Sequence, residues 1–157
     1  MKKLLLLLSL VLFTNSFSSE NFKISSEEYR GWNHVKSMVI YSESHPLFNP
    51  FGGIHHVYTN DKGLKTVKKC SSRKFKEGSV LVFVLYKANE SNGAFTEGVK
   101  KIEAFMVKNS KKYKNTNGWG YSAYMNGKNI VKNMRKDCHS CHSQVKNKDY
   151  VFSCWTR

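Results

Sequence analysis

Alanine and proline are scarce in this chain, and each scarcity limits the structures it can form. Only four alanines occur among its 157 residues, whereas aromatic residues make up 13% of them. A helical bundle is rich in good helix formers, so this composition instead favours strands of β-branched and aromatic side chains. Both prolines lie in the segment 42–53, which also contains a Gly-Gly pair and is therefore predicted to be a loop.

Acidic residues are also few. The chain has 26 lysines and arginines against 11 aspartates and glutamates, which gives a net charge of +15. In a cytosolic protein this balance would suggest a nucleic acid partner, but the export predicted below argues against nucleic acid. The charge is typical of a solvated basic surface, and it could also attract an acidic redox partner or anionic lipid.

Long apolar runs are limited to the start of the chain. Two lysines precede an apolar run from Leu4 to Phe13, and small residues follow that would allow cleavage after Ser18. The pattern predicts a secretory signal peptide over residues 1–18, and the run is too short for a permanent membrane anchor. We therefore expect residues 19–157 to form a single exported domain in the periplasm.

The stretch RKDCHSCHSQ places Cys138 and Cys141 three positions apart, with His142 directly after the second cysteine. In a C-x-x-C-H motif the two thiols add across the vinyl groups of one haem, and the histidine lies under the iron as its proximal ligand. The spacing alone leaves open a zinc site, a thioredoxin-like pair or a simple disulfide. Predicted export favours covalent attachment, with one haem c per chain.

No methionine follows the motif. Small electron-transfer cytochromes usually carry their motif near the N-terminus and a downstream methionine as sixth ligand, whereas the 15 residues after His142 contain no methionine. We therefore expect His142 to be the only strong protein ligand of a five-coordinate iron.

The remaining pattern predicts an α+β fold, an antiparallel β-sheet with an N-terminal helix and a C-terminal helix that bears the haem motif. Ser25 and Glu28 form a capping box, which predicts a helix over residues 25–39. Residues 61–78 are interpreted as a basic surface helix or turn. Strands are predicted at four segments, of which 78–86 is apolar on both faces and therefore central: 54–59, 78–86, 101–109 and 118–125.

Several short segments follow one another along the chain in this order: YRGW, HHVYTND, FKEGSVLVF, NGWGY, CHSCH and KDYVF. This ordered set, from Tyr29 to Phe152, resembles the cytochrome P-460 family, which includes the β-sheet cytochromes c-prime-beta. The resemblance implies a mono-haem c-type cytochrome that is predominantly antiparallel β and commonly a homodimer. It also implies that the iron has one protein ligand and an open distal face.

The family contains two chemistries, and the residue at one strand position separates them. Hydroxylamine-oxidising members carry a lysine there that is cross-linked to the haem, whereas cytochromes c-prime-beta present aromatic residues over the iron. The matching residue here is Phe83. Lys87 is four residues further along, about 13 Å in an extended strand, too far to substitute. The resemblance therefore makes Phe83 the first candidate for the distal pocket, and Phe51 the second.

Polar candidates for the distal face are weaker. His55 falls where oxidising members place a distal arginine, so it could donate a hydrogen bond to a ligand or bind the iron itself. Its neighbour His56 must point to the opposite face of the strand. Glu103 is either a proton relay or a solvated charge. Cys70 and Cys154 are left over and could pair in an oxidising compartment, although their separation is not fixed by the sequence.

These features lead to three functional hypotheses. The first is a gas-binding cytochrome with a five-coordinate haem and a hydrophobic distal pocket that takes nitric oxide or a similar small ligand. The second is an oxidoreductase acting on hydroxylamine or a related nitrogen compound, and the third is a periplasmic electron carrier. Because Phe83 replaces the cross-linking lysine, the sequence favours the first hypothesis, a binding protein rather than an enzyme.

Overall fold

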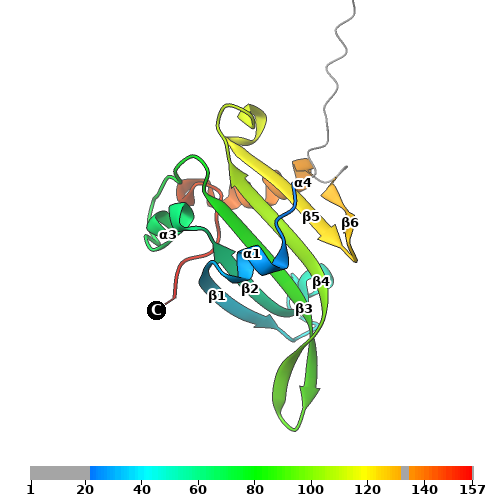
Figure 1. Cartoon of the computed structure of the whole chain (residues 1–157). Coiled ribbons are helices and arrows are strands. Elements are labelled where there is room, and N and C mark those ends of the chain that lie inside the picture. The colour runs from blue at the N-terminus through cyan, green and yellow to red at the C-terminus, as the bar shows by residue number, and fades with distance from the viewer. Residues whose placement is uncertain (1–21, 132–134, 157) are drawn as a thin grey trace, which may run out of the picture.

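Strand segments that alternate apolar and polar residues build one antiparallel sheet, in which each strand pairs with the next strand in the sequence (Figure 1). The computed structural model describes residues 22–131 and 135–156. The predicted signal peptide, residues 1–18, lies outside the described residues. The six strands are β1 (Asn33–Ile40), β2 (Gly53–Thr59), β3 (Val80–Ser91), β4 (Ala94–Lys108), β5 (Trp119–Met125) and β6 (Lys128–Asn129).

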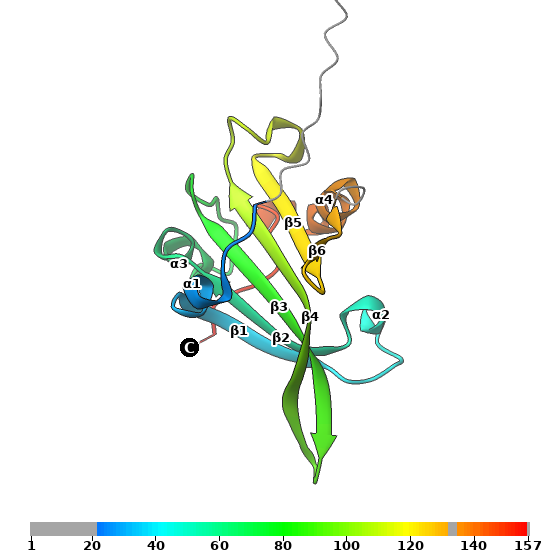
Figure 2. The ribbon, with the colours of Figure 1, turned by 45° about the vertical axis from the view of Figure 1, so that its right-hand side comes forward.

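The strand β3 lies inside the sheet between β2 and β4, as its two apolar faces predicted. Val82 and Val84 point to one face and Leu85 to the other, and all three side chains are fully buried. Beyond the sheet, β3 and β4 continue as a long hairpin that projects from the rest of the molecule (Figure 2). The predicted α+β class with an antiparallel sheet is confirmed.

The helix α1 (Ser26–Arg30) covers one face of the sheet, which we call the α1 face. Ser25 caps it by accepting a hydrogen bond from the Glu28 amide, and Tyr29 is completely buried. The helix ends at Gly31, so the predicted helix over residues 25–39 is wrong beyond its first turns. The residues that follow are taken into β1, which pairs with β2, and Val35, at the register shift of that pairing, is buried in the core of the motif side of the sheet.

The other face, which we call the motif face, carries the larger core and all the remaining helices of the described residues that pack on the sheet. On it lie α3 and α4, and α2 lies on the same side at the other end of the sheet (Figure 2). The predicted segment 61–78 does begin with a helix, and its Val67 is fully buried. The helices are α2 (Phe48–Phe51), α3 (Asp61–Val67) and α4 (Arg135–His142), with short 3-10 helices η1 (Lys114–Thr116) and η3 (Ser143–Lys148).

Glu103 lies on the α1 face and holds α1 to the sheet. Its carboxylate accepts hydrogen bonds from the Tyr29 hydroxyl at 2.6 Å, the Lys100 ammonium at 2.7 Å and the Ser26 hydroxyl at 3.1 Å. Its exposed fraction is only 6%, so the expectation of a solvated charge is wrong. It also lies on the face opposite Phe83, which removes it as a proton relay for a site there.

None of the helices in the described part of the chain is long and apolar enough to cross a membrane.

The first prediction concerns the acid sensitivity of this anchor. Burial would raise the pKa of Glu103, but hydrogen bonds from the three neighbouring side chains outweigh burial and lower the pKa. A carboxylate whose folded-state pKa is lowered stabilises the fold above its unfolded-state pKa, and this stabilisation is lost as the pH falls through the folded-state pKa. Glu103→Gln should therefore lower the free energy of unfolding at neutral pH by about 1.5–3 kcal/mol.

Chemical denaturation of the wild type and the variant from neutral to acidic pH checks this. The difference in free energy of unfolding between the wild type and Glu103→Gln should narrow as the pH falls. Glu90→Gln, at an exposed position on the projecting hairpin, is the matched control and should leave stability nearly unchanged. A gap that is absent at neutral pH, or that widens in acid, would contradict the role of Glu103.

Candidate functional site

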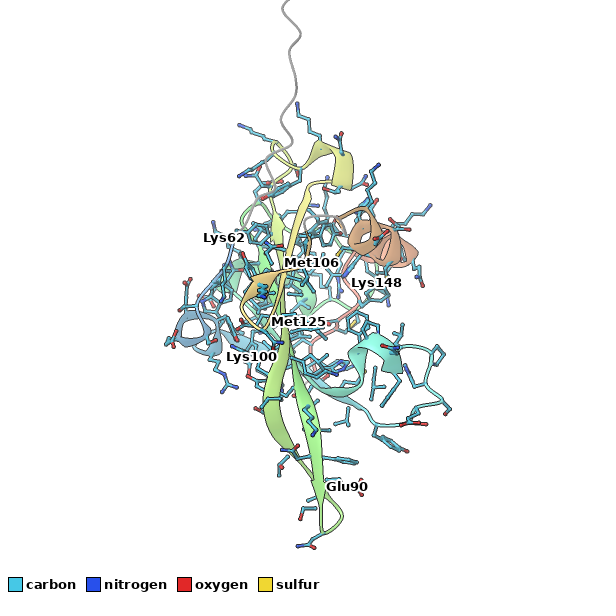
Figure 3. The ribbon with its side chains drawn as sticks, turned by 90° about the vertical axis from the view of Figure 1, so that its right-hand side faces the viewer. Lys62, Glu90, Lys100, Met106, Met125 and Lys148 are labelled. Atoms are coloured by element: carbon cyan, nitrogen blue, oxygen red, sulfur yellow. The ribbon has the colours of Figure 1, made fainter. Side chains whose placement is uncertain are left out.

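The helix α4 presents the three residues of the C-x-x-C-H motif together. Cys138 packs against the core of the motif face, Cys141 is exposed and His142 ends the helix. Residues three and four positions apart share one face of a helix, so both sulfurs and the imidazole are on the same side of α4. Figure 3 shows α4 on one side of the sheet together with Lys148, which belongs to the following η3.

The imidazole of His142 is held in one tautomer. Its Nδ1 lies 2.6 Å from the Tyr150 carbonyl oxygen, and because a carbonyl only accepts hydrogen bonds, Nδ1 carries the proton. The lone pair is then on Nε2, the atom that a metal would take, and the described residues give Nε2 no hydrogen-bond partner. Burial also lowers the pKa of His142, which keeps the ring neutral.

The carbonyl that holds His142 belongs to an unusual turn. Asp149 and Tyr150 have φ values of 52° and 66°, the left-handed region that non-glycine residues seldom adopt. Two such residues in succession persist only where their surroundings fix them. The turn carries the Tyr150 carbonyl back over α4, and its geometry therefore decides where the imidazole of His142 points.

A buried ion pair fixes this turn. The Asp149 carboxylate accepts hydrogen bonds from the Lys108 ammonium at 2.9 Å and from the Phe75 amide at 2.8 Å. The Trp119 indole nitrogen lies 3.4 Å away and completes its surroundings. Lys108 is 2% exposed, so the pair is shielded from water. Strands β4 and β5 thus position the turn that contacts His142 through one aspartate, which sequence reasoning did not single out.

The three predicted distal residues lie together on the motif face. The rings of Phe51 and Phe83 meet edge to face, with centroids 5.9 Å apart, and the rings of His55 and Phe83 do so at 5.1 Å. Phe51 comes from α2, His55 from β2 and Phe83 from β3. The structure therefore brings these three residues into one cluster, which we call the Phe83 cluster.

The hydrogen-bond partner of His55 determines which of its ring nitrogens carries the proton. Nε2 contacts the Phe51 carbonyl oxygen, which can only accept, so Nε2 is the donor. Burial lowers the pKa of His55, so the ring is neutral and Nδ1 bears a lone pair. That Nδ1 is buried without a hydrogen-bond partner. The prediction that His55 could donate to a ligand therefore needs correction, because its remaining nitrogen is an acceptor.

Two other predicted residues lie away from this cluster. His56 points to the α1 face, where its ring nitrogens bond Ser37 at 2.7 Å and Glu97 at 2.6 Å. Lys87 is exposed where β3 leaves the sheet. Phe83 pairs with Val57 and Ala104, and β3 shifts register against β4 only beyond Leu85, so Lys87 does not take the position of Phe83.

The motif face suits a large, flat, apolar group. Phe83 is flanked across the sheet by Ala104, and Ala104 pairs with Ala123, so small side chains lie beside it. Apolar side chains that the chain leaves partly exposed belong to the same face or lie beside His142: Met38 at 44%, Met125 at 39% and Phe152 at 45%. A porphyrin would cover such surface, and the unpartnered nitrogen of His55 also lies on this face.

Within residues 22–131 and 135–156, no group of three or more histidine, cysteine, aspartate or glutamate side chains could hold a metal ion, as a zinc site would require. The residues fit haem, which brings four nitrogen ligands of its own.

Comparison with known families agrees with this geometry. The model of the Cytochrome P460 family matches residues 26–153, which is most of the chain. The chain therefore belongs to the cytochrome P460 family, and it is a cytochrome whose cofactor is haem. A search of curated proteins found no match to it.

The second prediction tests the ion pair beneath the turn. Lys108→Met leaves the Asp149 carboxylate buried without its cation, which should lower the free energy of unfolding by about 3–5 kcal/mol. Thermal or chemical unfolding of the holoprotein measures this loss. Lys111→Met removes an exposed lysine nearby and is the control, with an expected change within about 0.5 kcal/mol. Equal effects of the two variants would show that the pair does not hold the turn.

Proposed function

We propose that this cytochrome holds one haem c through thioether bonds to Cys138 and Cys141, with His142 as proximal ligand, and binds nitric oxide or a similar small gas. The observation that carries the proposal is the Phe83 cluster, two phenyl rings and a histidine without a free donor. When bound, the haem would supply an iron with one open coordination position.

The phenyl rings of Phe51 and Phe83 give the distal side its apolar character. They meet edge to face, and two phenyl rings over an iron would disfavour water and polar or bulky ligands. Neither ring offers a nitrogen that could bond covalently to a porphyrin. Lys101 reaches the backbone beside Phe51, but its ammonium donates to the Gly52 carbonyl at 3.0 Å. These features favour ligand binding over the cross-linked chemistry of the oxidising members.

The tautomer of His55 adds selectivity between gases. Bound dioxygen is polar and is stabilised by a hydrogen-bond donor, whereas nitric oxide and carbon monoxide need none. The single proton of the neutral ring is engaged by the Phe51 carbonyl. A site with an acceptor and two phenyl rings therefore favours nitric oxide or carbon monoxide over dioxygen.

One observation favours a second candidate function. The unpartnered Nδ1 of His55 could accept a proton or a hydrogen bond from a nitrogen compound that carries hydrogens, such as hydroxylamine. That chemistry belongs to an oxidoreductase rather than to a gas-binding protein. We rank it second because Phe83 stands in place of the cross-linking lysine.

The cellular setting belongs to the same proposal. Covalent haem attachment, together with the signal-like residues 1–18, supports an exported protein of the periplasm. The net charge of +15 suits an acidic redox partner. We further propose a homodimer, as the family resemblance implies.

The third prediction concerns attachment. Acid–acetone extraction of the denatured protein should leave the haem on the chain, because thioether bonds survive unfolding. Cys138→Ser and Cys141→Ser should each remove one of the two bonds, and the double variant should release all its haem. Cys70→Ser, outside the motif, is the control and should keep both bonds. Recovery of colourless wild-type chain would refute covalent attachment.

The fourth prediction concerns the distal side. Reduced protein should give a high-spin magnetic circular dichroism signal, since His142 is the only strong protein ligand. Phe83→Ala should open the pocket and speed carbon monoxide binding by about tenfold, equivalent to about 1.4 kcal/mol of barrier. Stopped-flow mixing measures the rate, and Phe95→Ala on the projecting hairpin serves as the control.

Two results would count against the gas-binding proposal. The first is a low-spin six-coordinate signal that disappears in His55→Ala, because the histidine would then close the iron. The second is haem mass on the proteolytic peptides that carry Phe83, Lys87 or Lys101, together with steady turnover of hydroxylamine. Either outcome would favour the alternative functions.

A further inference from the structure

The two cysteines outside the haem motif lie in contact, although 84 residues separate them in the sequence. Cys70 follows α3 and is exposed, and Cys154 lies near the end of the described chain and is partly buried. The Cys154 sulfur is 3.9 Å from the Cys70 carbonyl oxygen, so Cys154 lies directly against Cys70. The fold therefore brings together two thiols that the proposed haem chemistry does not use.

Arg73 lies beside this pair and helps to make the two thiols differ in pKa. Its Nη1 lies 3.7 Å from the Cys154 sulfur, and the side chain is 8% exposed. Burial would raise the pKa of Cys154, but hydrogen bonds from Cys70 and Arg73 outweigh burial and lower the pKa. The pKa of Cys70 is raised, chiefly through its interaction with the Cys154 side chain. Cys154 is thus the cysteine that more readily forms a thiolate, and Cys70 is the one exposed to solvent.

We propose that Cys70 and Cys154 are a redox site that closes to a disulfide, driven by a soluble disulfide or a thiol–disulfide oxidase. Cys70, the exposed thiol, forms a mixed disulfide with the oxidant and releases one oxidant thiol. The Cys154 thiolate then attacks the Cys70 sulfur, forms the internal S–S bond and displaces the second oxidant thiolate, which takes up a proton. Two cysteine thiols are oxidised and one oxidant disulfide is reduced to two thiols.

The bond would fasten the segment that positions the haem ligand. Arg73 donates to the Val151 and Ser153 carbonyls, each at 2.7 Å, so the segment that carries Cys154 is already held from the same place. That segment begins at Tyr150, whose carbonyl accepts a hydrogen bond from Nδ1 of His142. A cross-link at Cys154 would therefore stiffen the support of the proximal histidine, and reduction would loosen it.

The remaining backbone contacts show what the cross-link would add. The Trp155 amide donates to the Val67 carbonyl at 3.2 Å, and the Thr156 amide donates to the Val35 carbonyl at 3.1 Å. These bonds lie near the chain end, where local opening is easiest. A covalent link to Cys70 would hold the segment when such bonds open.

The test uses the full holoprotein, incubated with oxidised glutathione and then treated with iodoacetamide before proteolysis without reductant. We expect one peptide pair joined through Cys70 and Cys154. Dithiothreitol should separate the pair and make two cysteines alkylable, since it does not cleave thioethers to haem. Alkylation of both thiols after oxidation, or mixed glutathione adducts that never resolve, would overturn the proposal.

A second readout tests the coupling to His142. In resonance Raman spectra of the reduced iron, the iron–histidine stretching frequency should differ between the disulfide and dithiol forms of the wild type. Cys70→Ser and Cys154→Ser should show the dithiol value under both conditions, and Ser71→Ala should behave as the wild type. A disulfide that forms without any change in frequency would overturn the coupling. Both readouts are independent of the gas ligand, so they can fail while the proposed function stands.

Discussion

The arrangement of the C-x-x-C-H motif and the turn behind it depends on the buried pair of Lys108 and Asp149. The lysine comes from the end of β4 and the aspartate from the turn after η3, so the pair joins the sheet to the segment behind the motif. Without its cation, the carboxylate could not remain buried. Since the same aspartate adopts a left-handed conformation, one ion pair fixes both the position of the turn and its unusual shape.

The ion pair affects the motif through the backbone of the turn. The turn presents the Tyr150 carbonyl to His142, and this contact settles which imidazole nitrogen carries the proton. His55 shows the same arrangement, because its Nε2 donates a hydrogen bond to the Phe51 carbonyl. On both sides of the site a backbone carbonyl, rather than another side chain, decides the tautomer of a histidine. Each ring is left with one nitrogen that bears a lone pair, Nε2 in His142 and Nδ1 in His55.

The sequence predicted the parts of this arrangement that depend on local pattern. Four of the six strands and the central position of β3 follow from the apolar pattern, and the grouping of Phe83 with His55 follows from the alternation of side chains along a strand. The helix over 25–39 failed because the residues around Val35 gain more by pairing with β2, and Val35 by entering the core, than by continuing α1. Helical spacing in a short window cannot report that tertiary gain.

What the sequence did not predict depends on contacts between distant residues. Asp149 lies in the KDYVF segment that carries the family resemblance, but its partner Lys108 is 41 residues away in a chain rich in lysine. Arg73 likewise looks like one more basic surface residue until the fold buries it against the chain end. A signal did exist for the turn, since aspartate tolerates the left-handed region better than most residues. The aspartate therefore indicates a turn, but only the fold shows that the turn positions His142 through a hydrogen bond.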